Sequence, residues 1–316
     1  MTQTKSLVES SLLAGVAVVL FLASYFLPVV GIGFSLLCPA PLVVLGMRHD
    51  LQKATLGLVV ASILILLILG PVGALFFFLG FGVLGVGLGY LARKMDSGVE
   101  IILYGILISL GSKLLLMILA SRLTGVNPFS LDPGEMQQIV DRIFLFYEEK
   151  GLGGQNLSEV REQLYNSLRM IPLIFPALLS VASAVDCYLS YVVSRVILKR
   201  VGSSTLPPLP SFSVWRFPRS IFWALLVSVL LTIIGARGGT WNIWLKIGTN
   251  LRLLVNMVFL LQGLSLAWWF LSLKKVHSLI RGSMIVLVLF IPFMSQVALL
   301  LGIIDMWFDL RHRIRR

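Results

Sequence analysis

Nine stretches of this chain are apolar enough to lie in a lipid bilayer, and most are nearly long enough to cross it. The hydrocarbon core takes about 20 apolar helical residues to span. Only 13% of the residues are charged, roughly half the share in a soluble domain. We therefore expect an all-α, polytopic transmembrane helix bundle of eight or nine spans. The expected spans are Leu7–Leu27, Val29–Gly46, Ala54–Gly70, Val72–Ala92, Ile101–Ser121, Met170–Leu198, Ser220–Gly235, Leu251–Leu273 and Gly282–Ile304.

The net charge of +12 comes from bases in short clusters beside these spans, such as Arg93 and Lys94. Juxtamembrane lysines and arginines fix topology and meet anionic lipid headgroups. Membrane lipids are therefore expected partners, and nucleic acid is not.

No catalytic or metal-binding pattern is present. Both cysteines, Cys38 and Cys187, lie inside apolar spans, and the three histidines lie in charged linkers without metal-ligand spacing. The run from Gly80 to Gly85 matches G-x-G-x-x-G, but it lies inside a span with no strand before it. We interpret Gly82, Gly85 and Gly89 as a helix-packing face. The chain is expected to be neither an enzyme nor a cofactor-binding protein.

Loop charges orient the first six spans. Lys5 and the loops 48–53, 93–94 and 195–219 carry the bases and are expected in the cytoplasm. The expected location is the bacterial inner membrane, with a cytoplasmic N-terminus. The segment Arg122–Ser167 follows an odd number of spans and holds seven of the fourteen acids, so we expect it outside.

The external segment is expected to be helical. Asp132, Pro133 and Glu135 form a helix-start pattern, and an apolar face follows at Met136, Val140, Ile143, Phe144 and Tyr147. This face can serve as a lid over the bundle or as a packed connector. Pro172 and Pro176 are expected to kink the sixth span.

The last third allows two arrangements. If all three final spans cross, the basic tail 311–316 lies outside. If Ser220–Gly235 stays interfacial, the tail lies inside, but Lys274, Lys275 and Arg281 move outside. The second arrangement fits the positive-inside rule better.

Ionisable side chains deep in a span are costly and indicate a functional site. Lys113 lies in the middle of the fifth span and Asp186 in the middle of the sixth, so the two can form an ion pair, either structural or part of a substrate site. The further buried polar candidates are Arg252, Asn256, Gln262 and Gln296.

Small residues open the first span, including Ala14, Gly15 and Ala17. Such a patch allows close helix contact, either within the bundle or with another subunit. We expect docking on a partner, so that Ala14→Trp leaves the protein folded and abolishes co-purification with that partner. Destabilisation by this variant would assign the patch to internal packing.

Two resemblances follow from these features. Six spans with inside termini, the small-residue patch, and Cys38-Pro-Ala-Pro41 with Gly46-Met-Arg48 resemble the S components of energy-coupling-factor (ECF) transporters over about the first two hundred residues. The segments 206–218, Gln262-Gly-Leu264 and Gly302-Ile-Ile-Asp305 with Phe308-Asp-Leu-Arg311 resemble the YybS-like family of uncharacterised bacterial membrane proteins. The first resemblance implies a solute-binding bundle whose patch at Ala14, Gly15 and Ala17 docks on a coupling subunit with its ATPases.

Three parts are expected from this comparison. Residues 1–200 form a six-span, S-component-like bundle that includes the external segment 122–167. Residues 201–219 form a cytoplasmic proline-rich linker, and residues 220–316 form a two- or three-span part with a basic tail. The predicted function is small-solute binding or transport in the manner of an ECF S component. The alternative is a non-transporting scaffold or interaction protein of the cell envelope.

Overall fold

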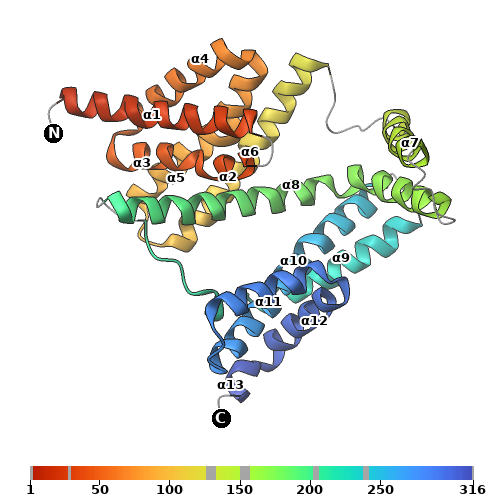
Figure 1. Ribbon diagram of the computed structural model, residues 1–316. Coiled ribbons are helices and arrows are strands. Elements are labelled where there is room, and N and C mark those ends of the chain that lie inside the picture. Colours follow the sequence, from red (N-terminus) through yellow and green to blue (C-terminus); the bar gives the residue numbers. More distant parts are fainter. Residues whose placement is uncertain are drawn as a thin grey trace. The chain divides into compact units, whose positions relative to one another are not determined.

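The structure is a computed structural model that describes residues 3–27, 30–125, 133–149, 157–201, 206–237 and 242–314. Every regular element in these ranges is a helix (Figure 1). The elements are α1 Gln3–Phe26, α2 Gly31–Leu37, α3 Pro39–Arg48, α4 Leu51–Leu75, the π-helix η1 Phe76–Gly82, α5 Val83–Lys94, α6 Gly98–Thr124, α7 Pro133–Glu149, α8 Leu157–Val201, the 3-10 helix η2 Phe212–Val214, α9 Ile221–Ala236, α10 Ile243–Leu273, α11 Ser278–Phe290, α12 Pro292–Phe308 and α13 Leu310–Ile314.

Among the described residues, five helical stretches are long and apolar enough to cross a membrane, or six if α11 and α12 form one bent span. The five are Val8–Phe26, Leu51–Lys94, Gly98–Thr124, Met170–Arg200 and Ile243–Leu273. The all-α fold class is confirmed, whereas the expected number of eight or nine spans is not. Two expected spans are shorter apolar helices, Gly33–Arg48 and Ile221–Ala236.

The 44-residue stretch Leu51–Lys94 is broken at Gly70, whose φ of 75° and ψ of −175° are not helical. A Cβ added at Gly82 would collide with the side chain of Leu58. A straight helix would separate these residues by about 36 Å, so the chain folds back between them. The fold-back coincides with the expected boundary between the third and fourth spans.

The chain divides into two compact units. Unit 1 comprises residues 1–130 and 179–209, and unit 2 comprises residues 131–178 and 210–316. This division differs from the expected one, because the external segment groups with the C-terminal helices. The 45-residue helix α8 belongs partly to each unit.

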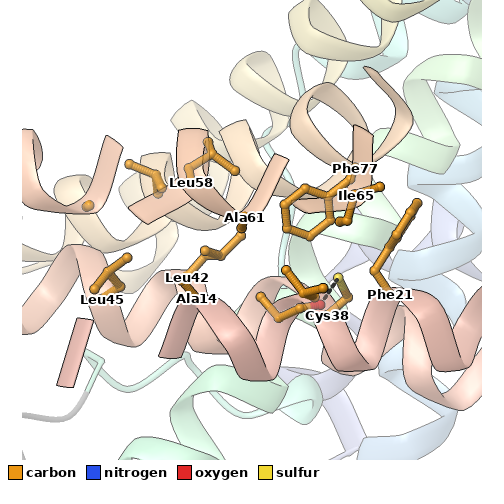
Figure 2. Packing of buried hydrophobic residues seen from close by; sticks show 13 residues of the cluster. Ala14, Phe21, Cys38, Leu42, Leu45, Leu58, Ala61, Ile65 and Phe77 are labelled. Atoms are coloured by element: carbon orange, nitrogen blue, oxygen red, sulfur yellow. Dashed lines mark hydrogen bonds between the residues drawn. The ribbon is translucent and has the colours of Figure 1, made fainter. Parts of the chain in front are cut away.

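One hydrophobic cluster of unit 1 lies among α1, α3, α4 and η1 (Figure 2). A second lies among α3, α5, α6 and α8. Phe21 and Phe77 meet edge to face with ring centroids 5.2 Å apart. Helices α3 and α5 approach through their backbones, since a Cβ at Gly89 would lie 2.6 Å from the Val43 oxygen. A Cβ at Gly85 would lie 2.9 Å from the Pro39 oxygen. The helix-packing interpretation of these glycines is therefore confirmed.

The loops expected in the cytoplasm gather at one end of unit 1. Glu9 of α1 pairs with Arg48, and Arg93 donates to the His49 carbonyl at 2.8 Å. Beyond Arg93, Gly98 lies against Tyr191, whose hydroxyl donates to the Pro207 carbonyl at 2.7 Å. One end of unit 1 therefore contains Glu9 near the start of α1, the loops 48–53 and 93–94, and the linker after α8.

In unit 2, α7 packs on the N-terminal part of α8. Val140 and Phe144 are buried, whereas Ile143, expected on the same face, is 43% exposed. Asp141 bonds Arg161 and accepts a hydrogen bond from the Tyr165 hydroxyl at 2.9 Å. The side chains of Met136 and Tyr147, and the capping residue Asp132, lie outside the described residues. The packing supports a connector between α7 and α8, and nothing in it tests a lid.

Helices α9, α10 and α12 form the rest of unit 2. A Cβ at Gly248 would lie 2.7 Å from the Thr232 nitrogen of α9. A Cβ at Gly263 of α10 would collide with the Ala298 oxygen of α12, and one at Gly302 with the Phe259 oxygen. These glycines allow α10 and α12 to lie in backbone contact, as small residues do in membrane helix pairs.

The linker, the α10–α11 turn and the tail lie at the same end of unit 2. The Phe212 ring is 6.2 Å from the Trp268 ring, the Arg281 guanidinium is 5.0 Å from Trp268, and Arg311 donates to Ser265 at 2.9 Å. Both arrangements expected for this region place the turn and the tail on opposite sides, whereas the structure brings the two to the same end of unit 2. The reason is a 105° bend between α11 and α12, which returns the chain toward the end it left.

Candidate membrane-buried polar sites

Lys113 of α6 and Asp186 of α8 form an ion pair in unit 1. The ammonium donates to Asp186 Oδ2 at 2.7 Å and to Ser109 Oγ at 2.6 Å. The Lys113 side chain is 19% exposed and the Asp186 side chain 21%, so neither is sealed in the core. The two groups predicted to neutralise each other do lie together.

The pair lies deep within unit 1. Ser109 is the eleventh residue beyond Gly98, which puts it about 16 Å along α6 from the end that carries the loops. This is about half of a 30 Å hydrocarbon layer. One turn before Asp186, Ser183 is fully buried, and its hydroxyl has no hydrogen-bond partner among the described residues. The site therefore comprises one carboxylate, one ammonium and the Ser109 hydroxyl, and the unsatisfied Ser183 hydroxyl lies one helical turn away on α8.

A second polar cluster lies in unit 2 around Gln262. Its side-chain amide donates to Asp305 Oδ2 at 2.7 Å, and its oxygen accepts from the Phe217 nitrogen at 3.1 Å. Arg311 lies 3.4 Å from the same carboxylate. Gln262, Asp305 and Arg311 are all at least 95% buried.

This cluster fixes the linker to the helices. Arg311 donates to the carbonyls of Ser213 and Trp215, and Ser265 donates to the Phe212 carbonyl at 2.7 Å. An arginine donates several hydrogen bonds from one planar group, so it can hold an extended segment that has no helix of its own. The cluster is a structural clamp on the linker.

Asn250 of α10 bonds the backbone of α8 on both sides of Pro176. Its amide nitrogen donates to the Leu173 carbonyl at 2.7 Å, and its oxygen accepts from the Ala177 nitrogen at 2.8 Å. These two backbone groups are four residues apart, the spacing of partners within an α-helix. They lie in the part of α8 that contains Pro172 and Pro176, where the sequence predicts a kink.

The other three polar residues predicted from the sequence do not belong to these clusters. Arg252 and Gln296 are exposed, and Asn256 is half-buried. No hydrogen bond or ion pair within the described ranges involves any of the three. Among the described residues, no group of histidine, cysteine or acidic side chains could hold a metal ion.

The small residues of the patch on α1 face different surroundings. Ala14 and Ala17, predicted to dock on a partner, are instead buried in the core of unit 1, so a bulky residue at Ala14 is not expected to be tolerated. A Cβ at Gly15 would have no other residue's atom within 4 Å. Gly15 lies in an open apolar hollow of about 720 Å³ along α1, lined by Val8, Ser11, Leu12, Gly15, Val16, Val19 and Leu20.

Comparison with known proteins assigns the chain to a family. Residues 15–306 match the family described as "Predicted membrane protein (DUF2232)". The chain belongs to this family. It is 22% identical to "Uncharacterized protein YybS" of Bacillus subtilis (strain 168) over 315 residues, which cover the whole of both chains. No solved structure matches this chain.

The resemblance of this DUF2232 member to YybS is thus confirmed, whereas the resemblance to ECF S components is not shown. The residues quoted for the YybS-like resemblance converge in the clamp of unit 2. Gln262, Asp305 and Arg311 meet there, and Gly263 contacts Gly302 beside them. Sequence reasoning proposed Gln262 as a buried polar residue but missed Asp305 as its partner. In the sequence, the only indication of this cluster is that the three segments quoted for the YybS-like resemblance carry polar residues next to apolar spans.

Proposed function

We propose that this protein binds or transports a small solute or ion in the bacterial inner membrane, with its N-terminus in the cytoplasm. The observation that carries the proposal is the Lys113–Asp186 pair, near the middle of two long apolar helices. Charged groups at such depth typically mark substrate or ion pathways. Both side chains are about one-fifth exposed, which leaves them open to a solute.

The polar groups around the pair support this function. Ser109 already binds the ammonium, and the buried Ser183 hydroxyl is left to bind something else. An unsatisfied buried hydroxyl costs free energy, which a polar solute or a water molecule would recover.

The experiment is mass spectrometry of small molecules that co-purify with the detergent-extracted protein. The matched variant is the double substitution Lys113→Met with Asp186→Leu, which removes both charges together. We expect a molecule that accompanies the wild type to be lost from a double variant that is folded and equally stable. An unchanged set of molecules in that variant would reduce the pair to a structural role.

Coupling to a membrane-embedded subunit and its ATPases, in the manner of an ECF S component, is a further part of the proposal. Ala14 and Ala17 are already covered within unit 1, so a partner helix would have to approach at Gly15 and the open hollow beside it. That hollow is also the observation that favours the alternative function, an envelope scaffold. An apolar hollow on the outer face of a helix suits another helix better than it suits a polar solute.

A further inference from the structure

The turn between α10 and α11 collects positive charge that nothing in the described protein balances. Lys274 and Lys275 lie in the turn, His277 is the residue before α11, and Arg281 lies in its first turns. No ion pair among the described residues involves Lys274, Lys275 or Arg281. The nearest acids at this end of unit 2 are already engaged, Asp309 by Arg216 and Asp305 by Gln262 and Arg311.

The start of α11 adds to this positive charge. A helix N-terminus carries a partial positive charge and unpaired N–H groups. The first turn of α11 contains no acid, and its side-chain cap is a neutral acceptor, His277 Nδ1, which accepts from the Leu279 nitrogen at 3.4 Å. Arg281 therefore has the wrong sign for its position. Such an N-terminus is stable beside an anion.

Arg281 itself is held in place but unsatisfied. Its guanidinium lies 5.0 Å from the centre of the Trp268 ring, while its Nε atom is buried without a hydrogen-bond partner in the described part of the chain. A guanidinium fixed on an aromatic face is preorganised to bind a phosphate with its remaining donors.

Large apolar side chains surround the charges. Leu279 is 75% exposed, and Ile280, Leu273 and Phe270 are also exposed. A ligand that fits both parts must carry an anionic group and apolar chains. We propose that the α10–α11 turn binds the phosphate headgroup of an anionic phospholipid, with Lys274, Lys275 and Arg281 on the phosphate and the acyl chains along Leu279 and Ile280.

The test uses the purified full chain, titrated with phosphatidylglycerol or phosphatidylcholine and analysed by native mass spectrometry. Each base near an anionic membrane surface contributes about fivefold in affinity. We therefore expect the variant Lys274→Gln, Lys275→Gln, Arg281→Gln to lose about a hundredfold in phosphatidylglycerol affinity. The control Lys274→Arg, Lys275→Arg keeps the positive charge of the turn and is expected to keep the affinity.

Several outcomes would overturn the proposal. Equal binding of the two lipids is one, and equal losses of phosphatidylglycerol affinity in the variant and the control are another. The third is displacement of the lipid by millimolar inorganic phosphate, which would make this a site for free phosphate. If the triple variant does not fold, the exposed pair Lys274→Gln, Lys275→Gln replaces it, with an expected loss of about 25-fold. Full retention by that folded pair would also contradict the proposal. The inference does not rest on the proposed function, since it concerns unit 2 alone.

Discussion

Ala14 and Gly15 are neighbours in the chain with opposite surroundings. Ala14 is 4% exposed and packs in the core of unit 1, whereas Gly15 faces the open hollow. We predict that Ala14→Trp destabilises the protein by about 1–3 kcal/mol, because overpacking a filled core forces its neighbours apart. Gly15→Trp should be close to neutral in the same thermal-stability assay in detergent. Equal losses at both positions would show that the helix is oriented differently.

Lys113 and Asp186 carry the residue-scale prediction for the buried charges. Lys113→Met or Asp186→Leu alone leaves an uncompensated charge, so each should lower the thermal stability. The double variant should recover much of the loss, with a coupling energy of about 0.5–3 kcal/mol. Additive losses in this double-mutant cycle would mean that the 2.7 Å contact contributes nothing.

At the scale of elements, the contact between α7 and α8 should depend on pH. The hydrogen bond from Arg161, helped by that from Tyr165, lowers the pKa of Asp141. A lowered carboxyl pKa stabilises the docked helix fully above the ordinary value of about 3.9, and this stabilisation is lost as pH falls through the lowered pKa. Hydrogen exchange of α7 should therefore accelerate in acid beyond its intrinsic pH dependence.

The control for this contact is Asp141→Asn, which keeps the side-chain shape and removes the charge. In this variant the extra acid sensitivity of α7 should disappear. If wild type and variant show the same pH profile of protection, the Asp141–Arg161 bond does not hold α7 in place.

The sequence predicts most elements but not how they are joined. Apolar runs and proline positions locate α6, α8 and α10, because burial in lipid requires continuous apolar helix. The break at Gly70 follows from a Gly-Pro pair. The 105° bend between α11 and α12 does not follow, since charge counting treats each apolar run as a full crossing.

The candidate sites show the same limit. Lys113 and Asp186 stand out because each is charged within an apolar run, and consecutive spans often pack together. The clamp partners Gln262 and Asp305 are 43 residues apart, and an amide and an acid near a span end carry no signal for pairing. Asn250 bridging α8 is likewise a property of the packing of two distant helices.

At the scale of the whole molecule, the bend in α11–α12 predicts sidedness. Cysteines introduced at Ser211, Lys275 and Arg313 should react alike with an impermeant maleimide, and one at Gly153 oppositely. The first three lie at one end of unit 2, which we expect in the cytoplasm because it carries many lysines and arginines. Opposite labelling of Lys275→Cys and Arg313→Cys would mean that α11 and α12 together cross the membrane.

The measurement that tests the central claim most directly is the water accessibility of the Lys113–Asp186 site in membranes. In a background with Cys38 and Cys187 replaced by alanine, Asp186→Cys is treated with a small water-soluble thiol reagent. Val185→Cys is the matched control, one residue away on α8 and 47% exposed on its outer surface. If the pair lies on a solute path, Asp186→Cys reacts and Val185→Cys, facing lipid, does not. Failure of Asp186→Cys to react in a folded protein would contradict solute binding at this site.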